Sequence, residues 1–132
     1  MPEYCIRVKR VYEAPDPEDG CRILADRLWP RGLSREKAAL DRWVRDVAPT
    51  EALRKSYAHK AERYEDFRTA YRKELDENPE AEEVLCFCRS ALRSRNVTLL
   101  CAAKDENHSN AFVLCEWIKR KMEEKEDVLL SV

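Results

Sequence analysis

The stretch Val97-Thr-Leu-Leu-Cys-Ala-Ala103 is a run of seven mostly apolar residues between polar flanks. It is too short for a helix and suits a strand that is buried on both faces, as strands of parallel sheets are. Polar residues follow at once in Lys104-Asp-Glu-Asn-His-Ser-Asn110. A stripe at helical spacing comes next, and the three segments together predict a strand, a loop and a helix. The stripe consists of Ala111, Leu114, Cys115, Ile118 and Met122.

Working outward, apolar spacing predicts two further long helices. One carries the stripe Tyr64, Phe67, Tyr71 and Leu75 and ends at Asn78-Pro79, and the next carries Ala81, Val84, Leu85, Cys88 and Leu92. Ser34 and Thr50 are predicted N-caps of two short helices.

Towards the N-terminus, Cys5–Tyr12 and Arg22–Leu28 are predicted strands, separated by a turn at 14–20. We expect these two strands to form a hairpin or a neighbouring pair. Val128–Val132 is expected to be a short edge strand or an unstructured end. The whole chain, residues 1–132, is thus predicted to be one α/β domain of three layers, with a mainly parallel sheet flanked by helices on both faces.

Composition excludes several classes of protein. The chain has two glycines, so glycine-rich phosphate loops are absent, and its net charge is −1. The segment Gly20–Arg72 is locally basic, with thirteen Lys or Arg against eight Asp or Glu. No secretory leader or membrane span is visible, so we expect a cytoplasmic protein whose six cysteines are mostly buried structural thiols.

The loop after the buried strand is the first candidate site, because ligands of open α/β sheets bind beyond the carboxyl ends of strands. Lys104 supplies a positive charge, and His108 is a candidate acid or base that Asp105 can orient. Ser109 or Asn110 can cap the following helix, whose start favours an anion. The structural alternative is a charged turn in which Asp105 pairs with Lys104 and His108 lies on the surface.

The second candidate is Asp26-Arg-Leu-Trp-Pro-Arg-Gly32. Arg27 and Arg31 can clamp a phosphate or carboxylate, with Trp29 as a wall. The structural alternative is that Trp29 fills the core while Asp26 pairs with an arginine.

Asp46 and His59 are weaker candidates, either as helix-capping or surface residues or as parts of the same cleft. The spacing of histidines and cysteines predicts no preformed metal site, although Asp26, Asp105 and His108 remain an option for one.

Several segments, in order along the chain, resemble the YeaO-like family, a small prokaryotic domain. They are Arg10-Val-Tyr12, Asp26–Gly32, Leu40–Pro49, Leu53-Arg54 and Leu99–His108. The resemblance implies a single α/β domain and no particular activity. Carried over by position, it includes Asp26, Arg27, Trp29, Arg31, Asp46, His59, Lys104, Asp105 and His108. Family members often have His-Asn-His or His-Asn-Asn after the Ala-Ala-Lys-Asp turn, whereas this chain has His108-Ser109-Asn110, which puts a role for the middle residue in doubt.

These observations favour a small enzyme that binds an anionic ligand bearing phosphate or carboxylate, with Lys104, Asp105 and His108 as catalytic residues. The ligand-binding residues would be Asp26, Arg27, Trp29, Arg31, Asp46, His59 and Asn110. One alternative is a non-catalytic module that binds nucleic acid or protein, and nucleic acid is the less favoured partner. Another alternative is a protein associated with iron or another metal. The residues specify no cofactor and no oligomeric state.

Overall fold

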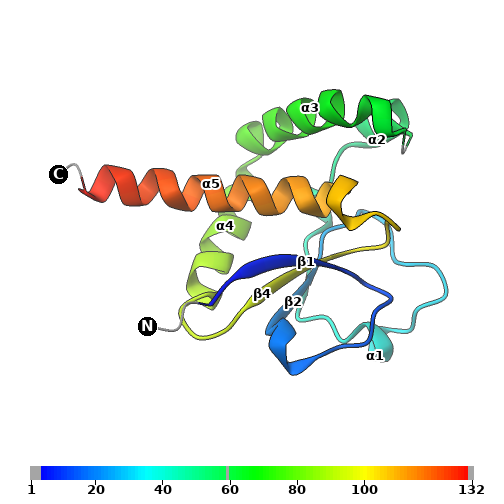
Figure 1. Cartoon of the computed structure of the whole chain (residues 1–132), viewed down its shortest axis with the longest axis horizontal. Coiled ribbons are helices and arrows are strands. Elements are labelled where there is room, and N and C mark those ends of the chain that lie inside the picture. The colour runs from blue at the N-terminus through cyan, green and yellow to red at the C-terminus, as the bar shows by residue number, and fades with distance from the viewer. Residues whose placement is uncertain (1–3, 59, 131–132) are drawn as a thin grey trace.

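A computed structural model describes residues 4–58 and 60–130 of the chain (Figure 1). Short 3-10 turns occupy Pro17–Asp19, Arg45–Val47, Ala61–Arg63 and Glu106–His108. In chain order, the strands and helices are β1 (Ile6–Arg10), β2 (Cys21–Leu24), α1 (Arg35–Ala38), β3 (Arg42–Trp43), α2 (Glu51–Tyr57), α3 (Tyr64–Glu77), α4 (Pro79–Ala91), β4 (Val97–Cys101) and α5 (Asn110–Leu130).

The four strands form one sheet in the order β1-β4-β2-β3, and every neighbouring pair is parallel. Strand β4 is central, because Val97 lies opposite both Ile6 of β1 and Cys21 of β2. All of its residues are buried. The predicted α/β class with a parallel sheet around a buried strand is therefore confirmed.

The predicted pairing of the first two strands is wrong. β1 and β2 run in the same direction with β4 between them, so they form neither a hairpin nor a neighbouring pair. β2 also ends at Leu24 rather than Leu28. The segment 11–20 returns across the sheet without an α-helix. A strand rises about 3.3 Å per residue, so this segment is long enough to run back along a five-residue strand. The prolines and Gly20 therefore belong to a crossover between two parallel strands and not to the turn of a hairpin.

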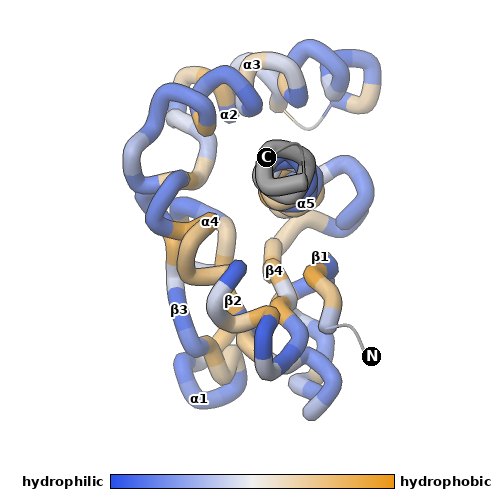
Figure 2. Tube along the Cα trace, turned by 90° about the vertical axis from the view of Figure 1, so that its left-hand side faces the viewer, coloured by the Kyte–Doolittle hydropathy of each residue, from blue (hydrophilic) through white to orange (hydrophobic). Residues whose placement is uncertain are grey.

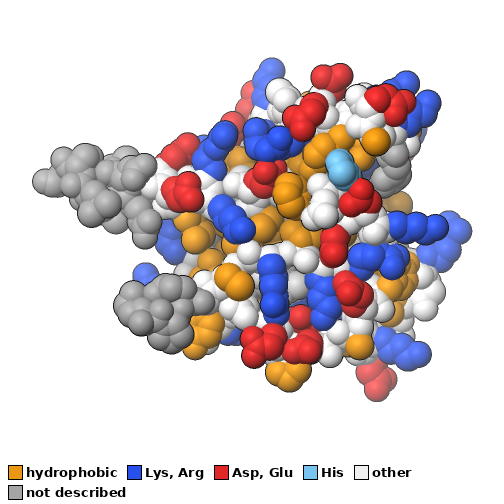
Figure 3. Space-filling model, in the orientation of Figure 1, with side chains coloured by type: hydrophobic (Ala, Val, Ile, Leu, Met, Phe, Trp, Pro, Cys, Tyr) orange, Lys and Arg blue, Asp and Glu red, His pale blue; other side chains and the backbone are white. Residues whose placement is uncertain are grey.

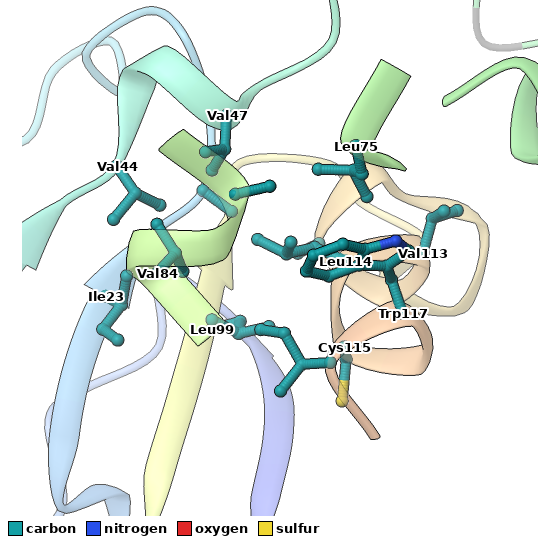
Figure 4. Close-up of a cluster of buried hydrophobic side chains, with 14 of the residues drawn as sticks. Ile23, Val44, Val47, Leu75, Val84, Leu99, Val113, Leu114, Cys115 and Trp117 are labelled. Atoms are coloured by element: carbon teal, nitrogen blue, oxygen red, sulfur yellow. The ribbon is translucent and has the colours of Figure 1, made fainter. Parts of the chain in front are cut away.

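Helices α3, α4 and α5 lie over one face of the sheet (Figures 1 and 2). Figure 4 shows how this core is built: Ile23 and Leu99 come from the sheet, Leu114 and Trp117 from α5, and Leu75 from α3. Each of these side chains is buried. Removing one Leu or Ile side chain from water contributes about 1.5–3 kcal/mol, so this layer supplies most of the apolar burial.

The opposite face has a thinner cover. Leu24 and Leu100 of the sheet, with Val11, pack against partly buried side chains that include Trp29 and Trp43. The segment 25–41 supplies most of this layer, and its helix α1 has only four residues. The layer is therefore mainly irregular chain where the sequence predicts crossover helices.

A buried ion cluster lies on the same face as α1. The Asp19 carboxylate, 2% exposed, accepts hydrogen bonds from Lys9 Nζ at 3.0 Å and from Arg22 Nη1 at 2.5 Å. Arg22, 4% exposed, also donates to the Ala38 carbonyl at 2.8 Å. Burial by itself raises the pKa of Asp19, but hydrogen bonds from Lys9, the Asp16 N–H and Arg22 bring it below its ordinary value. The cluster thus fastens the β1–β2 connection to the sheet and to α1.

The helix ends follow the sequence except at the C-terminus. The side chains of Ser34 and Thr50 accept the N–H groups of Lys37 and Leu53, so both predicted N-caps are confirmed. α5 continues to Leu130, so the strand or unstructured end predicted at Val128–Val132 is wrong for 128–130; 131 and 132 lie outside the described residues. Residues 119–126 are strong helix formers, which explains the continuation. Within the described part of the chain, no helix has the length and apolar content needed to cross a bilayer.

Candidate functional site

A cavity of about 340 Å³ lies at the carboxyl ends of the strands. Its walls come from the segments that follow β1, β2 and β4, and from α2, α3 and the start of α5. This is the end of the sheet at which α5 begins (Figure 1). Five of the predicted site residues line the cavity: Asp26, Arg27, Trp29, Arg31 and Asn110.

Asp26 and Asn110 join the strand ends that form the cavity floor. The Asp26 carboxylate accepts the Ala102 N–H at 2.8 Å, which links the exit of β2 to the exit of β4. Asn110 Nδ2 donates to the Ala25 carbonyl at 3.0 Å, which fastens the first residue of α5 to the same place. Both side chains therefore have a structural role in holding the cavity together.

Three arginines line the cavity, and they differ in how firmly hydrogen bonds hold their guanidinium groups. The Arg27 guanidinium donates to the carbonyls of Pro49 and Ala48 at 3.3 and 3.1 Å, so it anchors the segment before α2. Arg31 and Arg54 are exposed and stand at the rim. Of the two arginines predicted to form a clamp, Arg27 is therefore held by backbone carbonyls and Arg31 is exposed. Arg54 of α2 is a second exposed guanidinium in the same cavity.

Trp29 is mainly a packing residue. Its Nε1 donates to the Leu33 carbonyl at 2.6 Å, and its ring meets Trp43 edge to face with centroids 5.4 Å apart. The Arg35 guanidinium lies 4.8 Å from the ring centre. Because Trp29 also lines the cavity, it provides a rigid apolar wall.

The aromatic residues Tyr57 and Phe67 complete the cavity from the helical side. Their rings are stacked, with centroids 4.6 Å apart and planes 22° apart. Both are buried, at 7% and 3% exposure. They make an apolar inner wall that does not depend on a ligand for its packing.

A second, adjoining cavity of about 430 Å³ contains the three predicted catalytic residues, Lys104, Asp105 and His108. It shares Tyr57 and Ala103 with the first cavity. His108 Nδ1 lies 2.6 Å from Asp105 Oδ2, so Asp105 is placed to orient the imidazole. Both side chains are largely exposed, at 48% and 63%. The polar loop 104–110 thus contributes to both cavities: Ser109 and Asn110 line the first, beside the segment 26–32, whereas Lys104, Asp105 and His108 line the second.

The loop between the two cavities ends in a capped helix start. Ser109 Oγ accepts the Phe112 N–H at 3.1 Å and donates to the Glu106 carbonyl at 2.8 Å. Ser109, which is 2% exposed, is therefore the residue that caps α5. The predicted choice between Ser109 and Asn110 is settled by the hydrogen bonds, with Asn110 holding β2 instead.

We expect Ser109→Ala to lower the free energy of unfolding by about 1 kcal/mol, because the partly buried Phe112 N–H would lose its acceptor. Urea denaturation of the purified chain measures this change. Ser90→Ala, at an exposed position of α4, is the matched control and should stay within about 0.5 kcal/mol of wild type. Equal stabilities for the two variants would contradict the capping role.

Of the two weaker candidates, Asp46 does not line the cavity. Asp46 is exposed in the turn Arg45–Val47, and its carbonyl accepts from Asn78 Nδ2 at 2.9 Å. It lines separate hollows on the α4 side, and Thr50, not Asp46, caps α2. His59 lies outside the described residues.

Cys101, the last residue of β4, has a nucleophile-type side chain that is poorly suited to nucleophilic attack. Burial raises the pKa of its thiol to about 11, so the thiol stays protonated at neutral pH. Burial also raises the pKa of Tyr57, with a further contribution from Asp105, so its phenol stays protonated as well.

Among residues 4–58 and 60–130, no three His, Cys, Asp or Glu side chains gather in a way that could hold a metal ion. A three-residue metal site of Asp26, Asp105 and His108 is therefore not formed. Asp26 is instead bound to the Ala102 N–H, in the first cavity, while the other two residues lie in the second.

A family model described as the inactive DUF488-N3 subclade matches residues 5–131. The chain belongs to this subclade. It is 36% identical over 114 residues to the uncharacterized protein YeaO of Escherichia coli, covering 86% of this chain and 96% of that protein. It is also 37% identical over 111 residues to the uncharacterized protein Rv3073c of Mycobacterium tuberculosis, covering 84% and 91% respectively. The resemblance to the YeaO-like family is confirmed. No solved structure matches the chain significantly.

In this member of the DUF488-N3 subclade, the residues that line the candidate cavity include Tyr12, Arg54, Tyr57 and Phe67, none of which the sequence analysis selected as a site residue. Tyr12 and Arg54 lie in segments that match the YeaO-like family, and this was a usable signal. Phe67 was assigned to a core stripe, which is correct but incomplete, since it also faces the cavity.

Proposed function

We propose that this protein binds a small anionic molecule in the 340 Å³ cavity without converting it. The observation that carries the proposal is the joining of three arginines and an apolar wall in one cavity at the carboxyl edge of a parallel sheet, the usual ligand site of such folds. The cavity volume lies within the range of small-molecule sites.

Binding without turnover is favoured by two observations. The family that matches the chain is described as an inactive subclade. In addition, the candidate acid–base pair of His108 and Asp105 lines the neighbouring cavity and not the one with the arginines. The proposal includes a cytoplasmic location, in keeping with the exposed free thiols of Cys5 and Cys86.

Catalysis by His108, with Asp105 and Lys104, is the second candidate function. It is favoured by the 2.6 Å contact of His108 Nδ1 with Asp105 and by the two residues, Tyr57 and Ala103, that both cavities share. It predicts that His108→Ala changes the fate of a bound molecule, whereas the main proposal predicts unchanged binding in this variant.

A nucleic-acid surface is less well supported, because several basic side chains of the segment Gly20–Arg72 contact other residues of the domain. Arg22 is buried with Asp19, and Arg42 stacks on Phe87 at 3.9 Å. Arg68 is paired with Glu116 at 2.8 Å. The face drawn in Figure 3 shows acidic and basic side chains interspersed. On this face, the basic side chains therefore do not form one continuous basic surface.

The test is thermal unfolding with benzoate and with phenyl phosphate as anionic probes, and benzyl alcohol as the neutral probe. At ten times its Kd, a probe adds about 1.4 kcal/mol of stability, a measurable rise in Tm. We expect at least one anionic probe to raise the Tm of wild type and of His108→Ala. The rise should be lost in the double variant Arg31→Ala/Arg54→Ala.

The matched control is Lys37→Ala/Arg93→Ala, which removes two exposed cations that do not line the cavity. This variant should respond as wild type does. An unchanged Tm with both anionic probes, or an equal rise in the two double variants, would contradict binding at this cavity.

A further inference from the structure

The loop from β4 to α5 uses several of its backbone N–H groups within the chain. Phosphate sites of α/β folds use free backbone N–H groups of a glycine-rich loop and of a helix start. Here the N–H groups of Ala102, Asn107, His108, Phe112 and Val113 already donate to acceptors of the chain. The chain has two glycines, and neither lies in this loop. We therefore expect an anion in the cavity to be bound chiefly by side chains.

The exposed guanidinium groups of the cavity suit a carboxylate. Arg31 and Arg54 are exposed at its rim, and a guanidinium pairs with a carboxylate through two parallel hydrogen bonds. Asp26 lines the same cavity. Its carboxylate offsets one of the three guanidinium charges of the cavity.

The apolar surface of the cavity continues to its mouth. Leu28 is 59% exposed and Tyr12 is 41% exposed, and these are two of the three large exposed apolar side chains of the described residues. Both line the cavity, whose inner wall carries the stacked rings of Tyr57 and Phe67. An apolar molecule that enters would cover side chains that otherwise face water.

Resting on the proposed function, we infer that the ligand is a small aromatic carboxylic acid. Its carboxylate pairs with Arg31 and Arg54 at the rim. Its ring lies between the mouth residues, Leu28 and Tyr12, and the aromatic inner wall, where offset or edge-to-face contacts are favourable. The negative charge and the flat apolar body are thus recognised by different parts of one cavity.

Isothermal titration of the full chain with four probes tests this inference. The probes are 2-naphthoate, 2-naphthyl phosphate, 2-naphthol and cyclohexanecarboxylate. We expect 2-naphthoate to bind at least tenfold more tightly than each of the other three, although the phosphate has the greater charge. Arg31→Lys should weaken the binding of 2-naphthoate, because an ammonium cannot form the paired hydrogen bonds. Leu28→Ala, at an exposed position, should weaken the naphthyl probes and leave cyclohexanecarboxylate less affected.

The outcomes separate the inference from the proposed function. If 2-naphthyl phosphate binds as tightly as 2-naphthoate or more tightly, and Arg31→Ala/Arg54→Ala abolishes this binding, the carboxylate inference is overturned and the anion site stands. If cyclohexanecarboxylate equals 2-naphthoate, the aromatic part is overturned. If no anionic probe binds in a manner that depends on the two arginines, both the inference and the proposed function fail.

Discussion

Replacing Asp19 with Asn is expected to lower the free energy of unfolding by about 3–5 kcal/mol, the usual cost of removing one partner from a buried ion pair. Arg22 is 4% exposed and Lys9 donates to the same carboxylate, so the substitution leaves positive charge without its counter-ion inside the domain. Urea denaturation at neutral pH measures the loss. Because the carboxylate also fastens the crossover from β1 to β2, we expect the whole domain to unfold in one transition.

The same carboxylate makes stability depend on pH in a defined direction. Its pKa in the folded protein is below the ordinary value of 3.8, so the unfolded state takes up the proton first as pH falls. The stabilisation is complete above the unfolded pKa and is lost as pH falls through the folded pKa. The difference in stability between wild type and Asp19→Asn should therefore be largest near neutral pH and shrink below about pH 4.

The matched control for Asp19 is the exposed pair of Glu51 and Lys55, whose side chains are 70% and 75% exposed. Glu51→Gln removes one carboxylate charge, as Asp19→Asn does. Because this carboxylate is exposed to solvent, the substitution should lower the free energy of unfolding by only about 0–1 kcal/mol. A similar loss of unfolding free energy in both variants would contradict this prediction, because it would show that burial does not determine how much Asp19 contributes to stability.

Local patterns in the sequence predict the elements of this fold well, because each pattern reflects the environment of a single segment. The buried strand β4 follows from its apolar run, and α3 and α4 follow from stripes at helical spacing. Strand order is a different matter. Nothing within 5–28 reveals that β4, much later in the chain, lies between β1 and β2. The buried ion cluster was missed for a related reason, since charged residues usually lie on the surface.

The sequence likewise predicts one part of the candidate site and not the other. Asp26–Gly32 and Asn110 meet because they follow β2 and β4, which are neighbours in a parallel sheet, and the carboxyl-edge rule anticipates this. Arg54 and Tyr57 come from α2, whose place over the strand ends depends on contacts of Arg27 with the preceding carbonyls. Such contacts join segments far apart in the sequence, so spacing alone cannot predict them.

Gly20→Ala is expected to destabilise the fold by about 3 kcal/mol or more, through two separate effects. Gly20 has φ +63° and ψ −121°, a conformation that costs a residue with a Cβ about 1–3 kcal/mol. In addition, the new Cβ would lie 2.2 Å from the carbonyl oxygen of Asn96. That oxygen accepts the Cys21 N–H at 2.8 Å where β2 begins to pair with β4, so it cannot move away without loss of the pairing.

Gly32→Ala separates the two effects, because Gly32 also has a positive φ, +78°, but has open space around the position of a Cβ. It should therefore show the conformational cost alone, about 1–2 kcal/mol, and Gly20→Ala should exceed it clearly in urea denaturation. Equal losses would mean that the contact with Asn96 adds nothing and that the start of β2 can shift freely. A larger loss for Gly20→Ala places the constraint at the crossover, where the turn that the sequence marks as a hairpin instead sets β2 beside β4 and so brings Asp26 to the cavity.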